Sequence, residues 1–334
     1  MGRGAVRPDI RILCRPTNER PFLHDTSTSL CGSGLYAAWY ACTEGEIAGE
    51  TSIRGRFSPD GEHWGPVETV AEGRDYHYVP ASFYENGEGF HALVTRMTGH
   101  DRPADVLELI RRPSGWERVR IHRIPFLFNT APLPLQDGSL LAGGRVSPAP
   151  GELPRIPAAA RLEPGSPDWT VIPMPGPWER GAYPLPVPET ALLFRGSSVE
   201  AYVRNDGGNP WLFCSKDGGR TWTFDGETDI PAAGSKLYAG TLSDGREFLL
   251  YNERTPANDR SRLVLSLRAP GSGDFTARTI LADGYDAASD AGPFWHYPWA
   301  AERDGILWVS CTANGPDNRR SCALIRIPLN ALPV

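Results

Sequence analysis

The 334-residue sequence contains no apolar run long enough to span a membrane, and its N-terminus lacks the apolar segment of a signal peptide. These two absences predict a cytoplasmic protein. Basic residues are in the minority, since 34 lysines and arginines face 40 aspartates and glutamates and give a net charge of −6. Nucleic acids and anionic membranes bind basic surfaces, so we expect neither as a partner, whereas the oligomeric state stays open.

Motifs for metals and cofactors are missing as well. The six cysteines do not have the spacing of zinc ligands, and the chain has no phosphate-binding loop and no serine hydrolase elbow. We therefore expect neither a metal nor a cofactor. Cys311 and Cys322 flank a hairpin turn and could face each other.

Sustained helical amphipathicity is also absent, so we expect little helix. The 36 glycines and 32 prolines favour short strands joined by turns. An aromatic residue follows a Ser/Asp/Gly turn every 52 or 53 residues, at Trp64, Trp116, Trp169, Trp222 and Phe275. Glycine-containing hairpin turns run in phase with this series, at Gly34, Gly87, Gly138, Gly196, Gly245 and Gly305.

The two series define six repeated units, each with room for four strands. They predict an all-β protein with a single six-bladed β-propeller domain over residues 1–334, built from four-stranded antiparallel blades. The last unit ends one strand short. We expect the N-terminal segment Asp9–Cys14 to complete it and to cover its exposed edge.

The repeat contains a recognisable motif. Residues Ser215 to Trp222 read Ser-Lys-Asp-Gly-Gly-Arg-Thr-Trp and match the Asp-box, Ser-x-Asp-x-Gly-x-Thr-Trp, and Ser58 to Trp64 is a close variant. The Ser and Asp side chains of this motif can bind turn amides while the aromatic ring fills the gap between blades, so we expect a structural role. With this motif, the repeat and the stretches 37–45, 242–252 and 296–298, the chain resembles the Asp-box (BNR-repeat) sialidase-like branch of the sialidase superfamily.

The hairpin turns also predict which residues meet at the central channel. The innermost strands line the channel of a propeller, so equal offsets from the six turns converge on one mouth. Seven to ten residues before the turns are His24, Asp25, His77, Tyr78, Asn129, Glu189, Lys236, His296 and Tyr297. Seven to ten residues after the turns are Glu44, Arg96, Arg145, Arg204, Asn252 and Arg254. Arginines from four successive blades predict a pocket for an anion, most naturally a carboxylate, which arginine binds in a planar two-point geometry.

The resemblance to sialidases implies roles for some of these residues. In that family a tyrosine activated by a glutamate is the nucleophile, three arginines hold the carboxylate of the sugar, and a carboxylic acid is the acid/base. Glu189 and Arg204 match the glutamate and the second arginine by order and separation, and Tyr297 in His-Tyr-Pro matches the nucleophile. The open alternatives are Arg260, Arg262 or Arg254 for the third arginine and Asp25, Glu44 or Glu46 for the acid/base.

One departure concerns the substrate. The family's first arginine lies in an Arg-Ile-Pro motif, whereas this chain has His24, Asp25 and Thr26 in that register. The resemblance therefore implies a glycosidase for an acidic sugar that can differ from sialic acid.

Three functions fit these residues. The favoured one is a sialidase-like exo-glycoside hydrolase, because the glutamate and tyrosine stand at compatible positions. The second is a uronate lyase, in which an arginine neutralises the carboxylate while His77, His91 or Tyr297 abstracts the C5 proton. The third is a sugar-binding propeller without activity.

Overall fold

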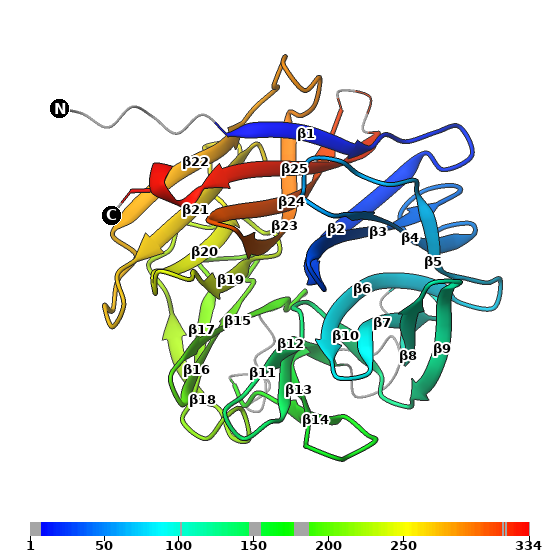
Figure 1. The fold of residues 1–334 in the computed structure, drawn as a ribbon. Helices are drawn as coiled ribbons and strands as arrows, with labels where there is room; N and C mark the ends of the chain where they lie inside the picture. The colour runs from blue at the N-terminus through cyan, green and yellow to red at the C-terminus, as the bar shows by residue number, and fades with distance from the viewer. Residues whose placement is uncertain are drawn as a thin grey trace.

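Six antiparallel sheets stand around a central axis like the blades of a propeller (Figure 1). The computed structural model describes residues 8–100, 102–146, 155–176, 187–315, 317 and 319–333. Within these residues the only helix is the short 3-10 turn η2 (Leu329–Ala331), and no helix is long and apolar enough to cross a membrane. The predicted all-β, six-bladed propeller is confirmed.

The strands follow the chain from blade to blade, with the innermost strand of each blade first. Blade 1 consists of β2 (Phe22–Cys31), β3 (Gly34–Cys42), β4 (Thr51–Ser58) and β5 (Glu68–Glu72). Blade 2 consists of β6 (His77–Asn86), β7 (Gly89–Met97), β8 (Pro103–Arg112) and β9 (Gly115–His122). Blade 3 has a divided inner strand, and consists of β10 (Phe126–Phe128), β11 (Leu133–Pro134), β12 (Leu140–Val146), β13 (Ile156–Leu162) and β14 (Thr170–Pro173).

The remaining blades continue around the ring. Blade 4 consists of β15 (Thr190–Arg195), β16 (Ser198–Val203), β17 (Trp211–Ser215) and β18 (Thr223–Glu227). Blade 5 consists of β19 (Tyr238–Thr241), β20 (Glu247–Asn252), β21 (Arg262–Arg268) and β22 (Ala277–Asp283). Blade 6 consists of β23 (Phe294–Arg303), β24 (Ile306–Asn314), β25 (Arg320–Pro328) and β1 (Asp9–Cys14).

The N-terminal strand closes the ring. Strand β1 pairs with β25 from Asp9 opposite Arg326 to Cys14 opposite Cys322. It forms the outer edge of the sheet that holds the C-terminal strands (Figure 1). The predicted completion of the last blade by Asp9–Cys14 is confirmed.

The hairpin turns contain glycines at positive φ, as the sequence predicts. In the Asp-Gly turns of blades 3 and 5, Gly138 and Gly245 adopt φ angles of 81° and 86°. Glycine tolerates this left-handed region because it has no Cβ, and each turn therefore reverses the chain within three residues, 136–138 in blade 3 and 243–245 in blade 5.

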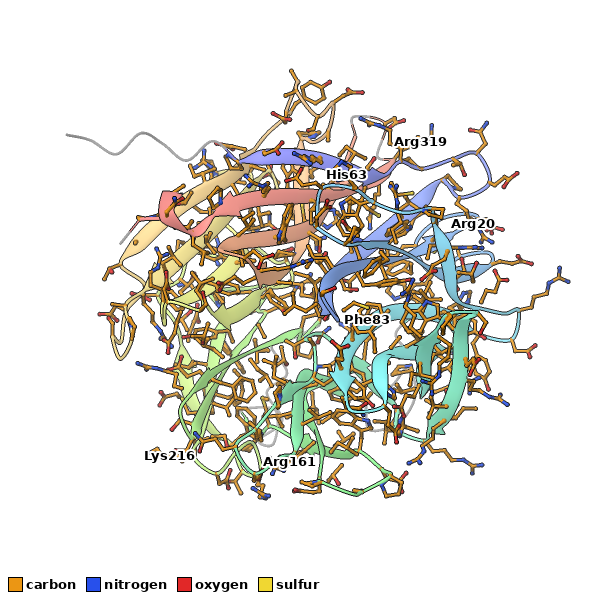
Figure 2. The ribbon with its side chains drawn as sticks, in the orientation of Figure 1. Arg20, His63, Phe83, Arg161, Lys216 and Arg319 are labelled. Atoms are coloured by element: carbon orange, nitrogen blue, oxygen red, sulfur yellow. The ribbon has the colours of Figure 1, made fainter. Side chains whose placement is uncertain are left out.

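The Asp-box of blade 4 joins its turn to the hydrophobic core. Ser215 Oγ accepts a hydrogen bond from the Gly219 amide at 2.8 Å, and Asp217 Oδ1 accepts bonds from two further turn amides. The Trp222 ring is 5% exposed and packs with Leu141 of blade 3. Figure 2 shows how such side chains fill the spaces between the sheets, Phe83 of β6 among them.

The sequence suggested that Cys311 and Cys322 could face each other, and the structure corrects this. Cys311 lies opposite Ala323 and Cys322 lies opposite Thr312 in the same strand pair. Successive side chains of a strand point to opposite faces, so the two cysteines lie on different sides of the sheet. Cys311 packs in the cluster against blade 5 and Cys322 in the cluster against blade 1.

Candidate active site

One mouth of the central channel holds a cavity of about 220 Å³. The inner strands begin at this mouth and their hairpin partners end there (Figure 1). Every blade contributes to its lining, which consists of Asp25, Tyr40, Glu46, Ile47, Val79, Pro80, Met97, His100, Leu127, Arg145, Val187, Glu189, Arg204, Arg260 and Tyr297. Small-molecule pockets usually measure about 300–1,000 Å³, so this cavity suits one sugar ring rather than a chain.

Irregular backbone at the start of two inner strands places two of these side chains. The pairing of β2 with β3 shifts register between His24 and Ser27, and that of β23 with β24 shifts between His296 and Trp299. Within these bulges Asp25 and Tyr297 have φ angles of 51° and 60°. Non-glycine residues rarely adopt this region, and such strain concentrates at functional sites.

Arg204 joins the predicted glutamate to the predicted tyrosine. Its Nη1 donates to Glu189 Oε2 at 2.8 Å and to the Tyr297 hydroxyl oxygen at 3.2 Å. Its Nε donates to Asp206 Oδ1 at 2.6 Å, which fixes the plane of the guanidinium. The structure therefore brings together at one end of the channel Glu189, which directly precedes β15, Arg204, which directly follows β16, and Tyr297, which lies in the bulge of β23.

The local charges set the protonation of this group. Burial raises the pKa of Glu189, but the attraction of Arg204, Arg145 and Lys236 outweighs it and leaves that pKa below its ordinary value. Burial and the charge of Glu189 raise the pKa of Tyr297, although Arg204 and Arg260 oppose them. At neutral pH the pair consists of a carboxylate and a neutral phenol.

Asp25 and Lys236 form an ion pair deep in the same mouth. Lys236 has no exposed surface, and its Nζ bonds Asp25 Oδ1. The same oxygen accepts a hydrogen bond from Trp299 Nε1 at 3.0 Å. The Lys236 ammonium lies 5.2 Å from the centre of the Tyr297 ring. Asp25 is thus already engaged by two donors.

Two neutral histidines support the tyrosine. The His24 ring lies 4.3 Å from the Tyr297 ring, and its Nδ1 is 2.9 Å from Thr312 Oγ1. His296 Nε2 is 2.7 Å from Asn314 Oδ1. Burial lowers the pKa of both histidines well below the ordinary value, and the repulsion of nearby cations lowers it further.

Three predicted arginines are held away from the cavity. Arg262 pairs with Asp283 and Glu253, and Arg254 bonds backbone carbonyls of residues 208 and 232. Arg96 makes a two-point ion pair with Asp105 of the next strand. Among the alternatives for the third arginine, only Arg260 lines the cavity, where its guanidinium carbon lies 5.5 Å from the Tyr297 ring centre.

Four other residues singled out from the sequence also lie outside the cavity lining. Glu44 and Glu46 are both exposed, and of the two only Glu46 lines the cavity. His77 Nδ1 is 3.1 Å from Thr51 Oγ1, outside the cavity. Asn129 is buried, and its side-chain oxygen accepts a bond from the Thr190 amide at 3.2 Å. His91 lies on β7 near Glu108, between blades 2 and 3.

Sequence reasoning missed contributors that fall outside the chosen offsets. Tyr40 lies six residues after Gly34, and its hydroxyl donates to Glu46 Oε1 at 3.4 Å. Arg320 begins the third strand of blade 6, and its Nη1 lies 3.4 Å from Glu46 Oε2. The offsets were counted from the hairpin turn between the first two strands of each blade. Arg320 lies in the third strand, so no offset pointed to it.

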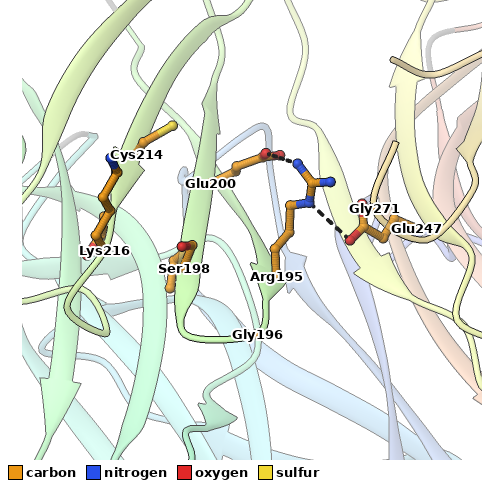
Figure 3. Close-up of a pocket in the computed structure, with 10 residues that line it drawn as sticks. Arg195, Gly196, Ser198, Glu200, Cys214, Lys216, Glu247 and Gly271 are labelled. Carbon is orange, nitrogen blue, oxygen red and sulfur yellow. Dashed lines mark hydrogen bonds and ion pairs between the residues drawn. The ribbon is translucent and has the colours of Figure 1, made fainter. Parts of the chain in front are cut away.

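A larger hollow of about 540 Å³ lies at the hairpin end of blades 4 and 5 (Figure 3). Three of its charged side chains bind one another. Arg195 Nη1 donates to Glu200 at 3.1 Å and Arg195 Nε lies 3.4 Å from Glu247. This network joins two blades, and the hollow does not include Glu189 or Tyr297.

The family of BNR repeat-like domains matches residues 33–309. The chain belongs to the BNR repeat-like domain family. No curated protein sequence matches it. Among solved structures, this BNR repeat-like chain resembles a protein of unknown function from Dyadobacter fermentans, with a TM-score of 0.75, 13% identity, and coverage of 96% of this chain and 99% of that one.

Two sialidases have the same fold. A variant of the NanB sialidase from Streptococcus pneumoniae has a TM-score of 0.77 and 10% identity, with coverage of 97% of this chain and 71% of that one. A variant of the Trypanosoma rangeli sialidase that displays trans-sialidase activity has a TM-score of 0.72 and 12% identity, with coverage of 99% of this chain and 59% of that one. The BNR repeat-like chain therefore shares the sialidase-like fold, and it spans only part of these enzymes.

Proposed function

We propose that this protein is an exo-acting glycoside hydrolase that releases a terminal acidic sugar, with Tyr297 as the nucleophile and Glu189 as its base. One observation carries the proposal. Arg204 contacts both residues from one nitrogen, inside a cavity that suits a single sugar ring. The fold shared with two sialidases supports the same chemistry.

The arginines supply the recognition of the acidic group. Arg145, Arg204 and Arg260 line the cavity from three successive blades. A guanidinium presents parallel N–H groups that match the two oxygens of a carboxylate. We assign these three residues to the carboxylate of the sugar.

Substrate binding would also activate the base. Without substrate, Arg204 and Arg145 counteract the effect of burial and hold the pKa of Glu189 below its ordinary value. A sugar carboxylate shares these cations, so the opposing effect of burial then raises the pKa of Glu189 and makes it a stronger base. Glu189 takes the phenolic proton, directly or through one water, as Tyr297 attacks the anomeric carbon.

Glu46 is the best placed acid/base. It lines the cavity, whereas Glu44 does not and Asp25 is held by Lys236 and Trp299. Glu46 would protonate the departing oxygen and then deprotonate the water that releases the sugar from Tyr297. Two displacements at one carbon predict retention of the anomeric configuration.

The uronate lyase is the second candidate, and one contact favours it. The neutral His24 ring lies against Tyr297, so a tyrosine and a histidine stand beside the arginines. His77 and His91 lie outside the cavity and do not fit this role.

Mass spectrometry of the products separates the possible functions. The wild-type protein is incubated with a panel of oligosaccharides that end in sialic acid or in a uronic acid. The proposal predicts a released terminal sugar that has gained the elements of water, with Glu189→Gln inactive and Arg262→Met fully active. An unsaturated uronate would replace the hydrolase by the lyase, and binding without any product would leave a sugar-binding propeller.

A further inference from the structure

Two cysteines face each other where the ring closes. Cys14 ends β1 and lies opposite Cys322 of β25. Both pack in one hydrophobic cluster between blades 6 and 1, together with Leu13 and Leu324. Directly opposite residues of an antiparallel pair have Cβ atoms about 4.5–5.5 Å apart. A disulfide needs about 3.5–4.5 Å, so a small local shift brings the two sulfurs into bonding range.

The backbone at this point can provide that shift. The register of β1 against β25 changes between Ile12 and Cys14, so Leu13 is an extra residue in the strand. Such a bulge at a strand end interrupts the regular hydrogen bonding and leaves the end of the strand adjustable. All six thiols are free in the structure. We propose that Cys14 and Cys322 are a redox modification site, at which a disulfide covalently closes the propeller.

The two cysteines differ in burial, and this difference determines which of them reacts first with an oxidant. Cys14 is half-buried, whereas Cys322 has no exposed surface. The Cys14 thiolate attacks one sulfur of glutathione disulfide, forms a mixed disulfide and releases one glutathione thiolate. The Cys322 thiolate then attacks Cys14 Sγ and releases the second glutathione. The two cysteine protons pass to the two released glutathiones, so the protein is oxidised by two electrons and glutathione disulfide is reduced.

The exchange should be slow and should accelerate with pH. Burial raises the pKa of the Cys14 thiol, and burial together with the neighbouring Cys14 raises that of Cys322. Only the thiolate reacts, so the rate should rise about tenfold per pH unit below the thiol pKa.

The cross-link would enclose the chain from residue 14 to residue 322. Stabilisation by a disulfide increases with the length of the enclosed loop, so a link between the first and last strands lies near the upper end of the range. For a chain of this size we expect the melting temperature to rise by about 5–10 °C. The outer strand β1 would also become protected from local opening.

The experiment uses the full chain as wild type and as C14S, C322S and C311S, each incubated with glutathione disulfide at about pH 8.5. Non-reducing peptide mapping should find a Cys14–Cys322 link in the wild type and in C311S, with loss of two hydrogens from the intact mass. C322S should instead accumulate glutathione on Cys14, and C14S should form neither product.

Several outcomes would overturn the proposal. These are a wild-type protein that keeps glutathione on Cys14 without closing the link, a link that involves Cys311, or free thiols at both positions after prolonged oxidation. A cross-linked protein with the melting temperature of the reduced protein would refute the closing role. Activity is not a readout here, so the result is independent of the proposed hydrolase.

Discussion

Replacing Arg204 by methionine should destabilise the folded protein, because it leaves the Glu189 carboxylate buried without its closest partner. Glu189 is 4% exposed and lies 2.8 Å from Arg204 Nη1. Removing one member of a buried ion pair costs about 3–5 kcal/mol. Arg145 and Lys236 remain to attract the carboxylate, so we expect a loss at the lower end, about 3 kcal/mol.

The loss should depend on pH in a defined direction. In the wild type the pKa of Glu189 is lowered, so this residue stabilises the fold above its unfolded pKa, and the contribution disappears as the pH falls through the folded pKa. In the variant, burial without Arg204 raises that pKa, and the ionised carboxylate then opposes folding at high pH. The gap in stability between variant and wild type should therefore be largest near neutral pH and shrink as the pH approaches about 4.

A double-mutant cycle measures the interaction without any substrate. Urea unfolding is followed for R204M, E189Q and the double variant, with R262M as a control for a partly exposed ion-paired arginine that should change stability by less than about 1 kcal/mol. Because E189Q removes the charge that R204M leaves unpaired, the double variant should be more stable than the sum of the single losses implies. Additive losses, or a gap between R204M and wild type that does not change with pH, would refute the buried pair.

Further predictions concern the core and the two remaining carboxylates. Trp222→Ala should lower stability by about 3–5 kcal/mol, because a nearly buried ring that packs against blade 3 is lost, while the protein that stays folded keeps its specific activity; loss of activity at an unchanged melting temperature would contradict this role. Lys236→Met should also destabilise, by about 3 kcal/mol, because Asp25 stays buried with only Trp299 as a donor, and adding Asp25→Asn should recover part of the loss in calorimetry. Glu46→Gln should strongly lower kcat/KM for substrates with poor leaving groups and largely spare it for aryl glycosides with good ones, whose kcat still falls because the hydrolytic water has lost its base; an equal loss of kcat/KM on both would exclude Glu46 as the acid.

The architecture was predictable because the repeat fixes the phase of every blade. The spacing of the tryptophans and hairpin glycines gives six units, and the missing outer strand of the last unit identifies Asp9–Cys14 as its partner. The same phase places Glu189, Arg204 and Tyr297 at one mouth. Each lies within three residues of a strand end, where the offset from a hairpin turn determines the level along the channel.

Arg96, Arg254 and Arg262 lie outside the cavity because the offset does not determine the direction or the partner of a side chain. Arg96 lies at the level along the channel that its offset predicts, but its guanidinium pairs with Asp105 of the adjacent strand. Arg262 similarly pairs with Asp283. The bulges that place Asp25 and Tyr297 in the cavity depend on the pairing of β2 with β3 and of β23 with β24. No local sequence pattern predicts these bulges.

The central claim is that Tyr297 performs the chemistry while the arginines bind the sugar acid, and Tyr297→Phe tests it most directly. The variant is compared with wild type in a turnover assay on the best substrate and in calorimetric titration with a non-hydrolysable analogue that carries the same carboxylate. The account predicts that turnover falls by about 10³-fold or more while the dissociation constant of the analogue changes by less than about threefold, because only the hydroxyl is removed. Turnover within about tenfold of wild type, or a loss of affinity as large as the loss of turnover, would contradict it.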